Sequence, residues 1–96
     1  MPSVVEWDQH KARWNLRKHG VSFVDAASVF GDPVARIFVD EDHSAEEQRE
    51  IIIGHSAPDT LLLVCFVEPA EGRIRIISAR RATKREQHDY EEYVTN

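Results

Sequence analysis

Several features that mark common protein classes are scarce or missing in this chain of 96 residues. Its single cysteine, Cys65, excludes an internal disulfide and is typical of a protein from a reducing cytoplasm. No apolar run approaches the roughly 20 residues of a membrane-spanning helix. The N-terminal segment reaches a charge at Glu6, which is too early for a secretory signal. We therefore expect a cytoplasmic protein that does not enter a membrane.

Metal-binding and cofactor-binding motifs are missing as well. The five histidines are scattered, with no pair at the spacing of a helical zinc site and no second cysteine to assist them (His10, His19, His43, His55 and His88). Nor does the sequence contain a glycine-rich phosphate loop or a nucleophile elbow. We therefore expect neither a metal nor another cofactor. What remains is chemistry that ordinary Arg, Lys, His, Glu and Tyr side chains can perform.

The composition is that of a globular protein. With 42% hydrophobic and 30% charged residues, the chain is richer in apolar side chains than a disordered segment. Its length is enough for one core of a few strands and helices. No repeat, low-complexity tract or long linker divides it. We therefore expect a single domain over residues 1–96.

Charge is distributed unevenly along the chain. The net charge is −5, yet the segment from Arg73 to Arg85 holds half of the twelve basic residues and no acid. Four more basic residues lie between Lys11 and Lys18, and the acids gather mainly at 40–50 and 91–92. The net charge argues against a non-specific nucleic-acid binder, because such binding depends on Lys and Arg. The two basic segments nevertheless indicate a molecule with one basic and one acidic face.

The beginning of the chain predicts a short strand and a helix. The strand occupies residues 3–7. Asp8 is a favourable N-cap, and Gly20 is well placed as the residue that ends the helix. Ala12 and Leu16 give this helix a thin apolar stripe.

A second helix follows directly. Ser22 is its predicted N-cap, and four apolar residues with helical spacing form its buried face (Phe23, Ala26, Ala27 and Phe30). The Gly31–Pro33 segment stops it. Trp7 and Trp14 are more typical of core or core-edge positions than of platforms on which nucleic-acid bases stack.

The rest of the chain predicts four strands and a final helix. The strand segments are apolar and separated by turn residues (34–39, 49–56, 60–68 and 73–81), with a polar loop at 40–48. Thr83 and Glu86 have the spacing of a capping box, which opens a helix to about Tyr93. The order β-α-α-β-β-β-β-α predicts an α/β (α+β) fold in which an antiparallel sheet packs against helices.

These residue types suit metal-independent RNA cleavage. In that reaction the 2′-hydroxyl of the substrate attacks, and the protein moves protons and stabilises charge on phosphorus. Arg80 and Arg81, at a strand end before a helix N-terminus, have side chains suited to phosphate. Histidines titrate near neutrality, so His19 is a proton-transfer candidate, as are Glu86 and Tyr90 on one face of the last helix.

The same residues have simpler interpretations. Arg73 and Arg75 alternate with isoleucines, as on any half-exposed strand. Arg80 paired with Glu86 would fasten the last helix to the sheet, an interpretation as well supported as the functional one. Similarly, His19 near the end of a helix is favourable simply because of the helix dipole.

Three stretches carry a family resemblance. They are EWDQHKARWNLRKHGVSFVDAASVFGDP (6–33), REIIIGHS (49–56) and RIRIISARRATKREQHDYEEY (73–93). In this order they resemble the BrnT family, the toxins of a bacterial type II toxin–antitoxin system. The resemblance implies a RelE-like fold and a metal-independent endoribonuclease that arrests translation by cutting free or ribosome-associated RNA. It also implies a BrnA-like ribbon-helix-helix antitoxin, held in a two-to-two complex that binds promoter DNA only through the antitoxin.

The family's recurring polar residues can be placed on this chain one by one (Lys11, Asn15, Lys18, His19, Arg49, Arg80, Arg81, Glu86 and Tyr90). We predict that Arg80 and Arg81 bind the scissile phosphate, with Arg49 as a further candidate. His19, Glu86 or Tyr90 would move protons. The predicted RNA-binding residues are Lys11, Asn15 and Lys18. The acidic net charge departs from a typical nuclease toxin and is compatible with a basic antitoxin that covers the acidic surface.

Two rival functions remain open at this point. The chain would act without catalysis if its arginines only held a segment of a ribbon-helix-helix repressor, as a co-repressor. Alternatively, it would bind single-stranded nucleic acid without cutting it, which predicts steep salt dependence of binding.

Overall fold

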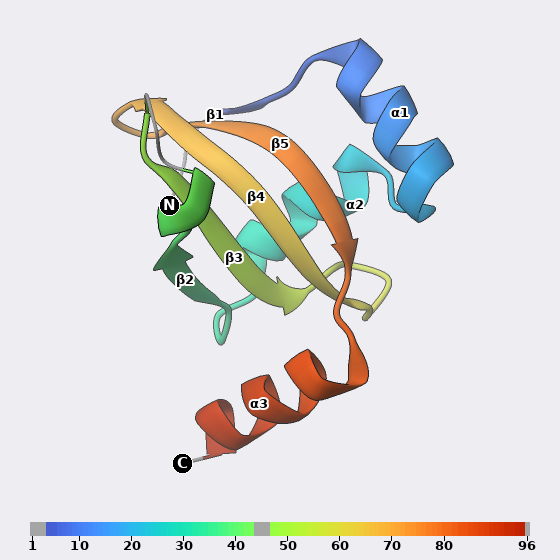
Figure 1. Ribbon diagram of the computed structural model, residues 1–96, viewed down its shortest axis with the longest axis vertical. Helices are drawn as coiled ribbons and strands as arrows, with labels where there is room; N and C mark the ends of the chain where they lie inside the picture. The colour runs from blue at the N-terminus through green and yellow to red at the C-terminus, as the bar shows by residue number, and fades with distance from the viewer. Residues whose placement is uncertain (1–3, 44–46, 96) are drawn as a thin grey trace.

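The computed structural model describes residues 4–43 and 47–95 (Figure 1). Its elements follow the order β1 (Val4–Glu6), α1 (Gln9–His19), α2 (Phe23–Ser28), β2 (Arg36–Val39), β3 (Arg49–His55), β4 (Leu61–Ala70), β5 (Arg73–Arg81) and α3 (Lys84–Thr95). Short 3-10 turns occupy Val29–Gly31 and Glu41–His43. The predicted order β-α-α-β-β-β-β-α is confirmed. Residues 44–46 of the predicted polar loop lie outside the described residues.

The five strands form one sheet in the order β1-β5-β4-β3-β2. Strands β2 to β5 are consecutive antiparallel neighbours, as their short connections predicted. Strand β1 extends this predicted antiparallel arrangement by pairing with β5 in parallel. Strands β1 and β5 are not joined by a hairpin turn, because two helices and three strands lie between them in the chain. Their relative direction is therefore not fixed by a short connection. The sheet is therefore mixed.

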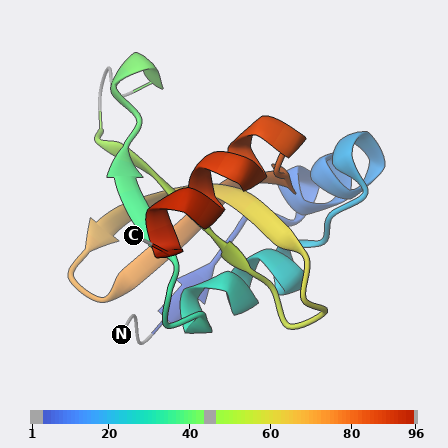
Figure 2. The same cartoon turned by 90° about the horizontal axis from the view of Figure 1, so that it is seen from below.

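Helices lie on both faces of this sheet. Figure 2 shows α2 on one side and α3 on the other, with α1 beside the β5 edge. The main core lies between the sheet and the N-terminal helices, where Val64, Ile76 and Val29 are fully buried. Neighbouring residues along β4 point to opposite faces. Leu62, Val64 and Phe66 therefore enter this core, whereas Leu63 and Cys65 face the α3 side.

The predicted helix ends are confirmed. The Asp8 carboxylate accepts hydrogen bonds from the His10 and Lys11 amides, and Gly20 adopts the left-handed conformation with φ of 69°. The Ser22 hydroxyl accepts a hydrogen bond from the Asp25 amide at the start of α2. The capping box of α3 is complete, because the Glu86 amide donates to the Thr83 hydroxyl and the Thr83 amide donates to the Glu86 carboxylate.

The buried face of α1 differs from the prediction. Leu16 is 51% exposed and Trp14 is 63% exposed, so neither belongs to the core. Ala12 and Trp7 behave as expected, because both pack against the core, and the Trp7 ring lies edge-on to Phe23 with centroids 6.0 Å apart. The buried position in the middle of α1 is instead the polar Asn15, which is 4% exposed. An apolar-stripe argument could not find it, because a polar residue occupies the central contact.

Asn15 replaces a missing strand partner at the β5 edge. Strand β1 pairs only with Arg73–Arg75, so Ala79 further along has no strand neighbour on that side. The Asn15 side chain donates to the Ala79 carbonyl at 2.8 Å and accepts from the Ala79 amide at 3.0 Å. It also donates to the Val21 carbonyl at 3.0 Å. One side chain thus ties α1, the following turn and β5 together.

The opposite edge strand, β2, is paired with β3 alone. All four of its residues are exposed, including Ile37, Phe38 and Val39. Val34 before it and Tyr93 on α3 are exposed as well. Within the described part of the chain, no helix is both long and apolar enough to cross a membrane.

Candidate functional site

A hollow of about 410 Å³ opens on the α3 side of the sheet. Leu63 lines both this hollow and the groove beneath α3, which places the two on the same face. Strands β3, β4 and β5, the end of α1 and the residue after β2 supply the lining (His19, Asp40, Arg49, Ile51, Leu63, Cys65, Ser78, Ala79 and Arg80). We call it the Arg80 hollow. Three predicted site residues, His19, Arg49 and Arg80, meet in it although they are far apart in sequence.

A β-bulge points Arg80 into the hollow. The register between β4 and β5 pairs Phe66 with Ile76 but Cys65 with Ser78, so Ile77 is an extra residue in β5. Without this bulge, strict alternation from Ile74 and Ile76 would turn Ser78 and Arg80 toward the main core. With it, Ala79 is the buried residue, and Ser78 and Arg80 face the hollow.

Glu86 fixes the orientation of Arg80. The two Nη atoms of Arg80 each donate to one Glu86 carboxylate oxygen at 2.8 Å, and Nη1 also donates to the Arg81 carbonyl at 3.2 Å. Among the described residues, none accepts from Nε–H or from the second Nη2–H. Glu86 therefore holds one edge of the guanidinium, and the edge formed by Nε and Nη2 remains for a bidentate ligand such as phosphate.

The electrostatics argue against Glu86 as the general base. The Arg80 guanidinium and the Thr83 amide lower the pKa of Glu86 to about 2. Such a carboxylate is ionised at neutral pH but holds a proton too weakly for efficient acid–base catalysis. The predicted proton-transfer role of Glu86 is therefore replaced by a positioning role, which is the ion pair anticipated as the simpler interpretation.

Arg81 does not join Arg80. Consecutive strand residues point to opposite faces, and Arg81 pairs with Leu62 of the main-core side. It is exposed beside a small cleft that Asp25, Ser56 and Thr60 also line. The structure therefore does not bring Arg81 into the hollow that Arg80 lines. Arg73 and Arg75 are exposed, as their alternation indicated, and both contact Glu6 of β1.

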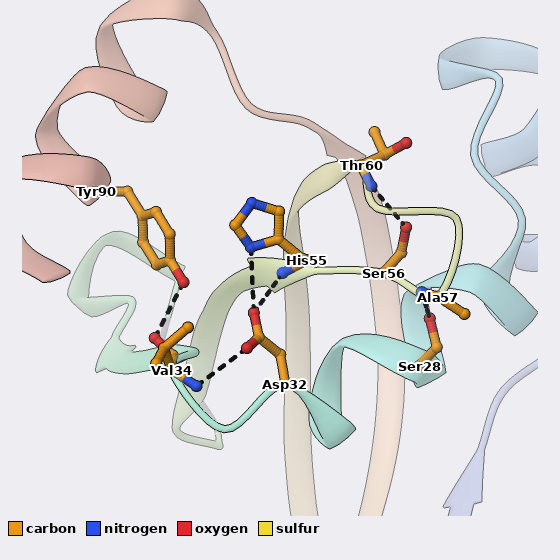
Figure 3. A network of polar contacts seen from close by, with 8 residues as sticks. All are labelled: Ser28, Asp32, Val34, His55, Ser56, Ala57, Thr60 and Tyr90. Carbon is orange, nitrogen blue, oxygen red and sulfur yellow. Dashed lines mark hydrogen bonds and ion pairs between the residues drawn. The ribbon is translucent and has the colours of Figure 1, made fainter.

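Tyr90 also lies outside the hollow. It is 5% exposed, and its hydroxyl donates to the Val34 carbonyl at 3.0 Å (Figure 3). Its ring packs edge-on against His55, with centroids 5.8 Å apart. Burial raises the pKa of Tyr90. A buried phenol that donates its proton to the backbone anchors α3, and this position favours a structural role over the predicted catalytic one.

Asp32 organises the rest of this anchor, as Figure 3 shows. Its carboxylate accepts hydrogen bonds from the His55 amide at 2.7 Å and the Val34 amide at 3.0 Å, and lies 3.4 Å from His55 Nδ1. Burial alone would raise the pKa of Asp32, but these hydrogen bonds outweigh it and the net shift is downward. Gly54 lets the segment that carries Asp32 and Ala35 pack closely against β3, since a Cβ at residue 54 would lie 2.8 Å from Ala35 Cβ.

The predicted RNA-binding residues separate into two kinds. Lys11 and Lys18 are exposed on α1, and Lys11 lines a shallow cleft beside Arg75. Asn15 is buried, and its amide is committed to the backbone of Val21 and Ala79. In this arrangement the amide supports β5 and is not presented to a ligand.

The model of the BrnT family, described as the ribonuclease toxin of a type II toxin–antitoxin system, matches residues 7–86. This chain belongs to the BrnT family. Among solved structures, it is similar to the 1.1 Å crystal structure of the Brucella abortus ribonuclease toxin BrnT, at 25% sequence identity and a TM-score of 0.65. That match covers 84% of this chain and 97% of the other. No curated protein matches the chain.

BrnT membership confirms the resemblance inferred from the three sequence stretches and the compact α+β fold. A type II system implies an antitoxin partner. Within residues 4–43 and 47–95, no group of three or more His, Cys, Asp or Glu side chains could hold a metal ion.

Sequence reasoning missed three residues of the hollow. Asp40 was assigned only to the acidic loop, and Cys65 and Ser78 were assigned to strands. Cys65 is half-buried rather than a core residue, and burial raises the pKa of its thiol. Side chains two residues apart on a strand share a face, so Cys65 could have been placed beside Leu63, and Ser78 beside Arg80. Predicting that Asp40 lines the hollow would have required the register between β2 and β3, and no sequence motif gives that register.

Proposed function

We propose that this BrnT-family protein is an endoribonuclease that cleaves RNA through the substrate 2′-hydroxyl, without a metal, and so arrests translation in the cytoplasm. The observation that carries the proposal is the meeting of His19, Arg49 and Arg80 in one hollow. A titratable side chain and two guanidinium groups are what this reaction needs to move protons and stabilise a phosphorane.

Arg80 would bind the scissile phosphate. Its Nε and Nη2 edge matches two phosphate oxygens, and Glu86 holds the guanidinium so that little orientation is lost on binding. Arg49, from the neighbouring β3, lines the same hollow and would share the extra charge of the transition state. Both residues act mainly by electrostatic stabilisation, which is strongest where donors are fixed in advance.

His19 would transfer protons. The 2′-oxygen loses its proton to a base and attacks phosphorus, the bond to the 5′-oxygen breaks, and an acid protonates that leaving oxygen. The products are a 2′,3′-cyclic phosphate and a 5′-hydroxyl. His19 can serve in either step. Asp40 is the carboxylate that lines the same hollow, and we propose it as the second group in this exchange.

The test uses the purified chain and an end-labelled single-stranded RNA in the presence of EDTA. We expect cleavage to products that carry a 2′,3′-cyclic phosphate and a 5′-hydroxyl. A matched RNA with 2′-deoxyribose at the cleaved position should remain intact. Cleavage that requires added metal, or that persists in the 2′-deoxy substrate, would disprove the proposed chemistry.

The apolar β2 edge supports a second activity, binding of the antitoxin. We propose a BrnA-like ribbon-helix-helix antitoxin in a two-to-two complex that reaches promoter DNA through the antitoxin alone. Ile37, Phe38 and Val39 form an exposed edge beside a groove of about 610 Å³ under α3. An unpaired strand edge readily takes another strand. Glu86, Asp89 and one cation, Arg36, line the groove, and the acidic residues 40–42 follow β2, so acids outnumber bases and a basic segment is the complementary partner.

A further inference from the structure

Trp14 has no part in the core or in the Arg80 hollow. It is 63% exposed in the middle of α1, whereas Trp7 packs against Phe23. An indole is among the largest apolar groups in proteins and is highly buried on average. An indole left in water in this way is typical of a surface that binds something.

The surroundings of Trp14 are basic. Helix α1 carries four cationic residues and no acid, in a chain whose net charge is −5. Lys11, Trp14 and Lys18 are spaced i, i+3 and i+7, so they lie along one side of the helix. Both lysines are exposed. An aromatic face between two cations complements an anionic ligand that also has a flat ring.

Both ends of α1 reach the sheet face that holds the Arg80 hollow. Lys11 lines a cleft with Arg75, and Arg75 is aligned through Val67 with Arg49, so its side chain shares the face of the hollow. At the other end of the helix, His19 lines the hollow itself. Trp14 lies five residues before His19, roughly 7.5 Å along the helix axis and about 140° around it. An RNA strand that leaves the hollow and passes over the exposed side of α1 would need more than one nucleotide to reach Trp14.

We propose that Trp14, between Lys11 and Lys18, is the platform on which an unpaired base of the RNA substrate stacks. The lysines contact the backbone phosphates on either side, and a phosphate further along the same strand enters the Arg80 hollow. This inference rests on the proposed ribonuclease function and adds a subsite to it. Every base has a π-face, so the platform selects single strands over duplexes rather than one sequence over another.

A protein contact is the competing explanation for an exposed tryptophan, since tryptophan is enriched at protein interfaces. The charges separate the two explanations. The apolar β2 edge has more acidic neighbours than basic ones, with Arg36 as its cation, and suits a basic protein segment, whereas the charged residues of α1 itself are all basic. RNA is therefore the occupant that fits α1.

The two tryptophans allow a direct test. The probe is a short single-stranded RNA with 2′-O-methyl groups, which cannot be cleaved. We expect it to quench the fluorescence of the wild type but not of Trp14→Phe, in which only Trp7 reports. Trp14→Ala should bind this RNA about 5- to 150-fold more weakly, the range measured for base stacking on aromatic residues. Leu16→Ala, an exposed apolar residue of the same helix, should bind normally.

The outcomes separate the platform from the proposed catalysis. If Trp14→Ala binds and cleaves RNA like the wild type, the platform is disproved while the ribonuclease function stands. If Trp14→Ala keeps full RNA affinity but loses the antitoxin, Trp14 is a protein contact and the platform is likewise disproved. If the wild type neither binds nor cuts RNA, both proposals fall. Equal urea midpoints for the two alanine variants would exclude misfolding.

Discussion

Glu86 binds Arg80 through two hydrogen bonds of 2.8 Å while also capping α3 through Thr83. The same carboxylate thus begins the last helix, attaches it to the end of β5 and orients the guanidinium that lines the hollow. Its residue type, its position on the last helix and the family resemblance all predicted a catalytic role for Glu86. The geometry makes it a positioning residue that acts through Arg80.

The two roles of Glu86 can be separated by substitution. Glu86→Gln retains a side chain able to complete the capping box but loses the charge that orients Arg80. We expect RNA cleavage to fall about tenfold, equivalent to ~1.4 kcal/mol, a value discounted for the partial exposure of the pair. Helix content, measured by circular dichroism, should be unchanged.

Thr83→Ala is the matched control, because it weakens the cap and keeps the Arg80 pair. It should cost about 0.5–2 kcal/mol of stability and leave the rate of cleavage intact in the folded protein. The reverse result, with normal cleavage in Glu86→Gln and loss in Thr83→Ala, would show that the cap rather than the orientation of Arg80 matters.

Acid should weaken the attachment of α3. The pKa of Glu86 in the folded protein is about 2, below the ordinary value of 4.5. Its contribution to stability is therefore complete above about pH 4.5 and is lost as the pH falls toward about 2. Urea midpoints of the wild type and of Glu86→Gln should converge over this window. Asp8 and Asp32, whose pKa values are also lowered, titrate in both proteins and cancel in the comparison. Parallel curves would contradict the role of the pair.

Asn15 should matter for stability before it matters for RNA. Asn15→Ala leaves the Ala79 amide and the Val21 and Ala79 carbonyls without their side-chain partner. Each buried unpaired group costs about 1–3 kcal/mol, so we expect a loss of at least that size in urea unfolding. Leu16→Ala should change stability little. A stable Asn15→Ala protein with reduced RNA affinity would instead support the original RNA-binding prediction.

The β2 edge should be needed for the antitoxin. The probe is a purified BrnA-like ribbon-helix-helix antitoxin, the partner proposed above. Phe38→Lys places a charge on the apolar edge and should weaken complex formation by about tenfold or more, as expected for an aromatic side chain at the centre of an interface. Val24→Lys, at an exposed position on α2, is the matched control and should leave complex formation unchanged. Equal complex formation by both variants, measured by calorimetry, would place the antitoxin elsewhere.

Local signals predicted the elements of this fold well. Asp8, Gly20, Thr83 and Glu86 end or begin helices as their residue types dictate, because caps depend on neighbours within one turn. The parallel pairing of β1 with β5 could not be predicted in this way, since it joins residues about seventy positions apart.

The site was only partly predictable for a related reason. The sequence identified His19, Arg49 and Arg80, but the bulge at Ile77 decides which face Arg80 and Arg81 occupy. Strict alternation would have given the opposite answer. The buried role of Asn15 depended on β1 being shorter than β5, which no residue near Asn15 reveals.

The most direct test of the account compares Arg80→Ala with Arg81→Ala in RNA cleavage by the purified protein. The two arginines are adjacent in sequence and alike in charge, but they face opposite sides of the sheet. Loss of a transition-state arginine should reduce kcat by about a hundredfold or more, whereas Arg81→Ala should retain most of the activity. Equal loss in both variants, or full activity in Arg80→Ala, would contradict the placement of the reaction in the Arg80 hollow.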